Sequence, residues 1–206
     1  MKNILLIRHG QSEWNKLNLF TGFKNIELTE LGIDEAKNAS KTFRELGIKF
    51  DLVYTSLLLR AQKTAKIILE GLDQFEVLVN NNKIIEHSAL NERDYGDLTG
   101  LDKKETANKY GEEQVYKWRR GYSDRPPAGE SLEDVVLRVR DYFNLEILPQ
   151  IHSNLNNNIL IAAHGNSLRA LLIVMDVYQI NEINSVELST GVPIHIIHEN
   201  DKFKIK

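Results

Sequence analysis

The chain of 206 residues contains no cysteine. This absence excludes disulfides, cysteine-based zinc sites and thiol catalysis, and it fits a reducing compartment such as the cytoplasm. The sequence has no run of about 18 apolar residues, so we expect no transmembrane helix. The apolar run at the start, residues 4–7, is short and is followed by Arg8 and His9, so we also expect no signal peptide.

An excess of basic residues is missing as well. The chain has 26 Lys and Arg against 29 Asp and Glu, which gives a net charge of −3. This balance argues against general nucleic-acid binding, although it leaves room for a local basic cleft. Apolar residues make up 42% and charged residues 27%, as in globular proteins, so we expect a single folded domain over residues 1–206.

Apolar runs typical of buried strands alternate with segments that have the apolar spacing of helices. The predicted strands are 3–7, 50–55, 75–79, 158–163 and 193–198, with a short edge strand within 201–206. The predicted helices are 30–46, 58–72, 103–110, 112–120, 132–143 and 167–174. This alternation predicts an α/β fold, a three-layer sandwich in which helices cover both faces of a mostly parallel central sheet.

Basic side chains stand where predicted strands end. The first strand is followed by Arg8 and His9, a later strand is followed by His164, and Arg60 opens the helix after the second strand. Ligand sites of parallel sheets lie at the carboxyl ends of the strands. We therefore expect these four residues to lie close together, although they are far apart in the sequence.

The residues near the two histidines are arginines, Arg8, Arg60 and Arg169, and not further metal ligands. Clustered guanidinium groups repel a divalent cation but bind phosphate through paired N–H donors, so we expect a phosphate site without a metal. A neutral imidazole can attack phosphorus while the other basic groups stabilise the equatorial oxygens. We expect Gly10 and Gly165 to let the backbone approach the ligand. The alternative for a lone histidine is a structural hydrogen bond to a carbonyl.

Phosphoryl transfer from an alcohol also needs an acid for the leaving oxygen. The candidate is Glu92, in the sequence LNERDYG within the long irregular segment 85–99. To donate a proton, this carboxyl needs burial or a carboxylate neighbour that raises its pKa. The alternative is a solvated loop glutamate.

Nearly the whole chain resembles the 2,3-bisphosphoglycerate-dependent phosphoglycerate mutases, a branch of the histidine phosphatase superfamily. The resemblance rests on RHGQSEWN, FTG, TSLLLRAQKTA, LNERDYGDLTGLDKKETANKYGEEQV, WRR and LIAAHGNSLRAL. It implies an isomerase of glycolysis and gluconeogenesis that interconverts 2-phosphoglycerate and 3-phosphoglycerate. The implied enzyme works through a phosphohistidine primed by 2,3-bisphosphoglycerate, needs no metal, and has small-molecule phosphoglycerates as partners, with no nucleic acid and no membrane.

The resemblance also implies a role for each matching residue. His9 is the implied nucleophile, Glu92 the implied general acid and base, and Arg8, Arg60 and His164 the implied phosphate pocket. The implied substrate contacts are Ser12, Asn15, Thr21 and Gly22, then Gly165 and Asn166 beside the second histidine, and an outer ring of Arg93, Tyr95, Lys103, Arg119 and Arg120.

Residues 121–130, GYSDRPPAGE, are fewer than in longer members of the family, and the C-terminus is also shorter. We expect the helix over 112–120 and the loop after it to cover the site instead. A broad phosphatase, favoured by the short loop, stays open as an alternative. So does a catalytically silent protein that binds phosphometabolites, although such a protein needs neither His9 nor Glu92. The resemblance leaves open the ratio of mutase to phosphatase activity and whether the chain forms a homo-oligomer.

Overall fold

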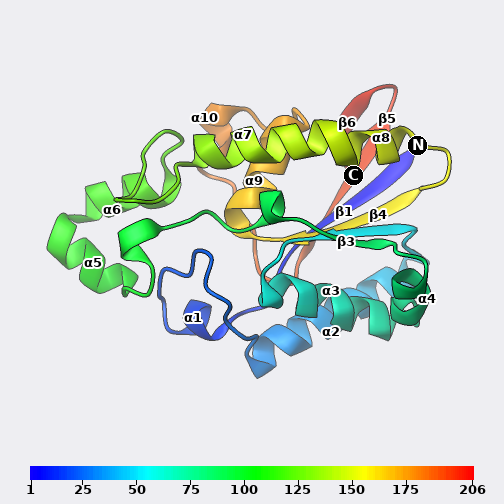
Figure 1. The fold of residues 1–206 in the computed structure, drawn as a ribbon, viewed down its shortest axis with the longest axis horizontal. Helices are drawn as coiled ribbons and strands as arrows, with labels where there is room; N and C mark the ends of the chain where they lie inside the picture. The colour runs from blue at the N-terminus through cyan, green and yellow to red at the C-terminus, as the bar shows by residue number, and fades with distance from the viewer.

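The computed structural model describes residues 1–206 and places helices on both faces of one six-stranded sheet (Figure 1). The strands lie in the order β3-β2-β4-β1-β5-β6. Their bounds are β1 Lys2–Arg8, β2 Leu52–Thr55, β3 Ile84–Glu86, β4 Asn158–Ala163, β5 Pro193–Glu199 and β6 Lys202–Ile205. Neighbours from β3 to β1 are parallel, whereas β5 and β6 pair antiparallel. The predicted α/β sandwich with a mostly parallel sheet is confirmed.

Ten α-helices surround this sheet. Their bounds are α1 Glu13–Lys16, α2 Glu30–Glu45, α3 Leu59–Gly71, α4 Phe75–Asn80, α5 Lys103–Tyr110, α6 Glu112–Arg120, α7 Leu132–Tyr142, α8 Leu148–His152, α9 Gly165–Val174 and α10 Ile180–Ile183. Figure 1 shows α2, α3 and α4 on one face and α7, α8 and α9 on the other, with α1, α5 and α6 beyond one end of the sheet. No helix combines the length and the apolar composition that a membrane span requires.

The strands feed two apolar cores because successive side chains of a strand point to opposite faces. In β1, Leu5 and Ile7 pack with Phe43 of α2, whereas Ile4 and Leu6 pack with Val139 of α7. All six side chains are almost completely buried. This burial on both faces explains why the central strands consist of nearly continuous apolar runs.

Most predicted elements are present within a few residues of the expected bounds, and 103–110, 112–120 and 158–163 agree to the residue. The strand predicted over 75–79 is wrong, because this segment forms α4 and the outer strand is Ile84–Glu86. Of the apolar residues in the run, Leu78 is buried whereas Val77 and Val79 are 61% and 43% exposed. A short apolar run has no period that separates a strand from a helix with one buried face.

The register of the sheet positions the site. Arg8 at the end of β1 lies opposite Ala163 at the end of β4. The next residues, His9 and His164, therefore leave the sheet side by side at its carboxyl edge. In Figure 1 the helices α1, α5 and α6 lie beyond this edge of the sheet.

Candidate active site

His9 and His164 form a buried pair at the carboxyl edge of the sheet. Their ring centroids are 5.0 Å apart, and the rings are inclined by 58°. The exposed fractions are 2% for His9 and 0% for His164. The backbone N–H of His9 donates to the carbonyl of Ala163 at 3.0 Å, which extends the strand pairing into the site. The prediction that the two histidines meet is confirmed.

Two hydrogen bonds determine the tautomer of His9. Its Nδ1 lies 2.7 Å from the carbonyl oxygen of Gly10, so Nδ1 carries the proton and donates it. The Nε–H of Arg60 donates to His9 Nε2 at 3.2 Å, so Nε2 bears the lone pair. Burial, followed by the charges of Arg60 and Arg8, lowers the pKa of His9 well below 6.5, and the Gly10 carbonyl only partly opposes them. His9 is therefore a neutral imidazole with Nε2 unprotonated.

His164 has one satisfied nitrogen and one unsatisfied nitrogen. Its Nε2 lies 2.7 Å from Ser56 Oγ, which also accepts the backbone N–H of Leu58 at 3.1 Å. Its Nδ1 is buried and has no hydrogen-bond partner in the chain. Burial, then the charge of Arg60, lowers its pKa well below 6.5. Ser56 was not among the predicted site residues, although it directly follows the strand predicted over 50–55 and so lies at the same edge of the sheet.

The carboxylate of Glu92 lies at the same buried cluster. Its Oε1 accepts hydrogen bonds from the Arg93 backbone at 2.8 Å and from the backbone and side-chain amides of Asn166 at 3.1 and 2.9 Å. Burial raises the pKa of Glu92, but the Arg93 amide, the charges of Arg60 and Arg8, and the Asn166 amide together lower it below its ordinary value. Glu92 is thus buried, as its expected role requires, but ionised; the raised pKa needed for proton donation is not found.

Three side chains converge on Gly165, the residue after the second histidine. A Cβ at Gly165 would lie 3.7 Å from both Arg169 Nη1 and Glu92 Oε2, and 3.9 Å from Arg8 Nε. The residue therefore lies at the centre of the polar cluster, as expected for a backbone that approaches a ligand. A side chain here would occupy the space between the carboxylate and the two guanidinium groups.

Gly10 is in close contact with the backbone of α2. A Cβ at Gly10 would lie 2.1 Å from the carbonyl oxygen of Gly32, and one at Gly32 would lie 2.1 Å from the carbonyl oxygen of Gln11. The loop after β1 thus packs backbone to backbone against the first turn of α2. This close packing requires a glycine at position 10, and the approach of the Gly10 backbone to a ligand stays a prediction.

Arg60 is buried, and each of its donor nitrogens has a partner. Besides the bond from Nε to His9, Nη1 donates to the Lys24 carbonyl at 2.8 Å and Nη2 to the Gly22 carbonyl at 2.9 Å. Burial lowers the pKa of Arg60 to about 10, so the group stays charged at neutral pH. The loop that contains Thr21 and Gly22 therefore fixes the arginine next to the nucleophile.

Arg8 and Arg169 are anchored by the segment that precedes β5. Arg8 Nη1 donates to the Leu188 carbonyl at 2.9 Å, while its buried Nε has no partner in the chain. Arg169 donates from Nε and Nη2 to the Val186 carbonyl at 3.1 and 2.8 Å. Both guanidinium groups are held by carbonyls on one side and face the cluster around Gly165 on the other.

Ser12 and Asn15 bind each other at the start of α1. The Asn15 backbone N–H donates to Ser12 Oγ at 3.3 Å, and the Ser12 backbone N–H donates to Asn15 Oδ1 at 3.1 Å. This reciprocal pair is a capping box, which satisfies two donors of the first helical turn. A contact from either side chain to a substrate stays a prediction.

The outer ring adjoins Glu92 through Asn166 and Tyr95. Asn166 Nδ2 donates to the Tyr95 hydroxyl at 3.4 Å, and Arg93 Nη2 donates to the same oxygen at 3.3 Å and to the Arg119 carbonyl at 2.7 Å. Arg93 is fully buried, yet its Nε and Nη1 have no partner in the chain. Burial lowers the pKa of Lys103, and Arg119 and Arg8 add to this effect while Tyr95 opposes it. These groups therefore share one electrostatic environment.

Arg120 ends α6 and pairs with Glu187 on the segment before β5. Its Nη1 is buried without a hydrogen-bond partner in the chain. An apolar cluster of Phe20, Leu98 and Val115 packs α6 against the loops that carry the site. Lys103, Arg119 and Arg120 of the outer ring thus lie on a separate helical unit, α5 and α6, whereas Arg93 and Tyr95 lie on the loop of Glu92.

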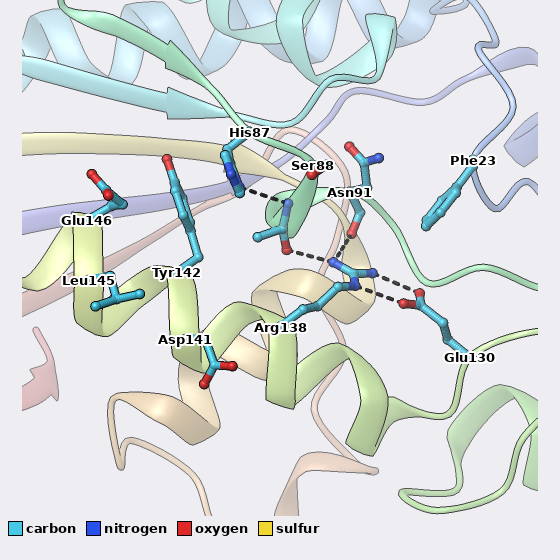
Figure 2. A pocket seen from close by; sticks show the side chains of 11 residues that line it. Phe23, His87, Ser88, Asn91, Glu130, Arg138, Asp141, Tyr142, Leu145 and Glu146 are labelled. Atoms are coloured by element: carbon cyan, nitrogen blue, oxygen red, sulfur yellow. Dashed lines mark hydrogen bonds and ion pairs between the residues drawn. The ribbon is translucent and has the colours of Figure 1, made fainter.

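Two hollows of equal volume lie near site residues, and neither is lined by His9 or His164. One of about 590 Å³ is lined by Phe23, by residues of the segment 87–91 and by side chains of α7, and is drawn in Figure 2. Another of about 590 Å³ is lined by Lys103 and Arg119 of the outer ring. The side chains best placed to ligate a metal, His152, His198 and Asp201, lie at the other end of the sheet, with ligating atoms within 4.8 Å of one another.

Comparison with known proteins identifies relatives over almost the whole chain. The model of the histidine phosphatase superfamily (branch 1) matches residues 4–206. A relative from Bartonella tribocorum is 51% identical over 193 residues, 94% of this chain and 90% of the relative. One from Parvibaculum lavamentivorans is 50% identical over 195 residues, again 94% and 90%. Both are named 2,3-bisphosphoglycerate-dependent phosphoglycerate mutase.

Solved structures share the fold at lower identity. The α-ribazole phosphatase of Shigella flexneri has a TM-score of 0.80 at 24% identity, over 99% of this chain and 94% of that one. Bacillus stearothermophilus YhfR also has a TM-score of 0.80, at 22% identity, over 100% and 95%. At these identities the likeness supports the fold alone.

Proposed function

The chain belongs to the histidine phosphatase superfamily, branch 1, and from this premise we propose that it is a phosphoglycerate mutase. It interconverts 2-phosphoglycerate and 3-phosphoglycerate, as the names of relatives at about 50% identity support. The observation that carries the proposal is the buried cluster in which neutral His9 and ionised Glu92 lie among arginines. It supplies a nucleophile, a proton carrier and an anion site together.

His9 acts as the nucleophile through Nε2. The N–P bond forms as the P–O bond of the donor breaks. The proton stays on Nδ1, which continues to donate its hydrogen bond to the Gly10 carbonyl. Arg60 releases its hydrogen bond to Nε2 as phosphorus approaches, and its charge then stabilises the phosphoryl oxygens. Arg8 and His164 complete the phosphoryl pocket with Arg8 Nε and His164 Nδ1, both of which have no partner in the chain.

Glu92 moves the proton that phosphoryl transfer requires. With the phosphoryl group on His9, ionised Glu92 takes the proton of the hydroxyl that attacks phosphorus. In the second transfer it returns this proton to the oxygen that departs from the other phosphate. The lowered pKa of Glu92 suits the first of these steps, because a base must be ionised. The bound phosphate offsets the charges of Arg8 and Arg60, two of the groups that lower the Glu92 pKa, and this shifts the pKa upward for the second step.

The outer ring holds the far end of the substrate. Five buried side-chain nitrogens have no partner in the chain, and they belong to Arg8, His164, Arg93 and Arg120. Unpaired buried donors are costly unless a ligand satisfies them. Their distribution over the phosphoryl pocket and the outer ring fits a ligand with anionic groups at both ends, such as 2,3-bisphosphoglycerate. When bound, this primer supplies the first phosphoryl group.

The remaining substrate contacts are part of the same proposal. We assign the phosphoryl side of the substrate to Ser12, Asn15, Thr21, Gly22, Gly165 and Asn166, and the far side to Tyr95, Lys103 and Arg119. We place the activity in a single catalytic domain, residues 1–206, in the cytoplasm, where a chain without cysteine is at no disadvantage. Its partners are small phosphoglycerates and neither nucleic acid nor membrane.

The test is a mutase assay with 3-phosphoglycerate, a trace of 2,3-bisphosphoglycerate and a metal chelator. We expect 2-phosphoglycerate to form, faster with the primer than without it, and we expect His9→Ala to abolish its formation. Release of inorganic phosphate from many monoesters at rates above mutase turnover would instead identify a broad phosphatase. The absence of both reactions would identify a protein that only binds phosphometabolites.

A further inference from the structure

Arg138 of α7 binds the peptide segment that carries Glu92. Its Nη1 donates to the carbonyls of Ala89 at 2.6 Å and Asn91 at 3.1 Å, and its Nη2 donates to the carbonyl of Glu92 itself at 3.0 Å. Figure 2 shows the guanidinium between this segment and Glu130. One side chain thus satisfies three carbonyls within four consecutive residues.

Glu130 binds both Arg138 and the backbone that follows Glu92. Its two carboxylate oxygens pair with Arg138 Nε and Nη2, each at 2.9 Å. The same carboxylate accepts the backbone N–H of Asp94 at 2.9 Å, and the Glu130 backbone N–H donates to the Asp94 carbonyl at 2.9 Å. The backbone before and after the pair Glu92 and Arg93 is therefore fixed by one bidentate ion pair.

The ion pair is well placed to hold a rigid geometry. The side chains of Arg138 and Glu130 are only 22% and 24% exposed, and α7 is fixed by buried Val135 and Val139. Fork-to-fork pairing of guanidinium and carboxylate orients both groups, unlike the single contact of an ammonium. The Glu92 loop has no regular strand or long helix of its own to position it, so this pair supplies the rigidity that a catalytic side chain needs.

We propose that Arg138 and Glu130 are positioning residues that hold Glu92 in register with His9. The inference rests on the proposed role of Glu92 as the proton carrier. Neither residue touches the reacting atoms in this arrangement. Their effect is on where the Glu92 carboxylate lies, and small displacements of a catalytic group lower the rate strongly.

The experiment compares two phosphoryl donors. Transfer to and from phosphoglycerates needs the proton carrier, whereas p-nitrophenyl phosphate releases a stable anion that needs no proton. With p-nitrophenyl phosphate, His9 gains the phosphoryl group and the P–O bond breaks with both electrons on the leaving oxygen. The burst of p-nitrophenolate therefore reports on His9 and its pocket, and mutase kcat reports on Glu92 as well.

We expect Arg138→Lys and Glu130→Gln to lower mutase kcat about 10- to 100-fold with little change in KM, and to change the burst rate less than about threefold. Glu92→Gln should show the same pattern with a larger loss. Arg140→Ala, at an exposed arginine of the same helix, should leave both rates unchanged. Circular dichroism checks that each variant is folded, and Glu130→Gln carries the test if the Arg138 variant is not.

An equal loss of burst rate and mutase kcat would show that the pair has a general structural role, and it would overturn the proposal. So would wild-type kcat in Arg138→Lys and Glu130→Gln while Glu92→Gln is impaired. If Glu92→Gln itself keeps wild-type kcat, the proposed role of Glu92 fails, and the positioning pair loses its basis for that separate reason.

Discussion

At the scale of single residues, the protonation state of His9 follows from its immediate contacts. The Gly10 carbonyl accepts the Nδ1 proton, Arg60 donates to Nε2, and burial next to two arginines disfavours the cation. The structural hydrogen bond that was the alternative to catalysis is therefore present, and it is the bond that leaves Nε2 unprotonated. The two interpretations of His9 do not compete.

The sequence allowed the candidate residues to be chosen, but not their electrostatic states. Strand ends and sequence motifs identify His9, His164 and Glu92, because both kinds of signal lie within short stretches of the sequence. The pKa of Glu92 depends on Asn166 and Arg60, which reach it only after folding. The packing of Gly10 on Gly32 is invisible for the same reason, since nothing in the sequence marks the approach of two distant backbones.

The buried histidines predict a pH dependence of stability. Both folded-state pKa values lie well below 6.5, so the unfolded chain binds protons first as the pH falls. The contribution of the two histidines to the free energy of unfolding has its full value above about pH 6.5. Below that pH it decreases by about 1.4 kcal/mol per histidine for each pH unit. We expect urea unfolding to show that the free energy of unfolding decreases less between pH 7.5 and pH 5.5 in His164→Asn than in the wild type. The exposed His152→Asn is the control, and an equal loss in His164→Asn would contradict the account.

At the scale of elements, α5 and α6 form a unit that lies beyond the end of the sheet and carries Lys103, Arg119 and Arg120 of the outer ring. These two helices were predicted to the residue, because their polar periodicity and the glycine between them are local signals. The run 75–79 was misread, because only a tertiary contact decides whether a short apolar segment pairs with a strand or packs one face as a helix. Arg138 was missed because on α7 it looks like an ordinary polar helix position.

We predict that α6 contributes to substrate binding through Arg120. Its Nη1 is buried without a partner, so an anionic ligand gains a charge-assisted hydrogen bond there. Arg120→Ala should weaken 2,3-bisphosphoglycerate binding about 10- to 100-fold in calorimetric titration, the loss expected for about 1.5–3 kcal/mol. Lys117→Ala, at an exposed residue of the same helix, is the control. Unchanged affinity in Arg120→Ala would show that α6 does not cover the site.

At the scale of the whole molecule, a sheet buried on both faces gives the site a rigid frame. The α/β architecture was predictable because strands and helices alternate along the chain, and the register of β1 and β4 then places the two histidines together. The net charge of −3 says little about the site, because arginines gathered at one edge determine the local field. Loops and the helices α5 and α6 add Glu92 and the far anion site to this frame, and Arg138 of α7 with Glu130 connects the Glu92 loop to it.

The measurement that tests the central claim most directly is the fate of radiolabelled phosphate from 2,3-bisphosphoglycerate. We predict acid-labile label on His9, absent from His9→Ala, and a chase with unlabelled 3-phosphoglycerate that carries the label into 2-phosphoglycerate. That result requires the nucleophile, the proton carrier and the far anion site to act in one enzyme. A chain that takes up no label, or a chase that yields only inorganic phosphate, would contradict it.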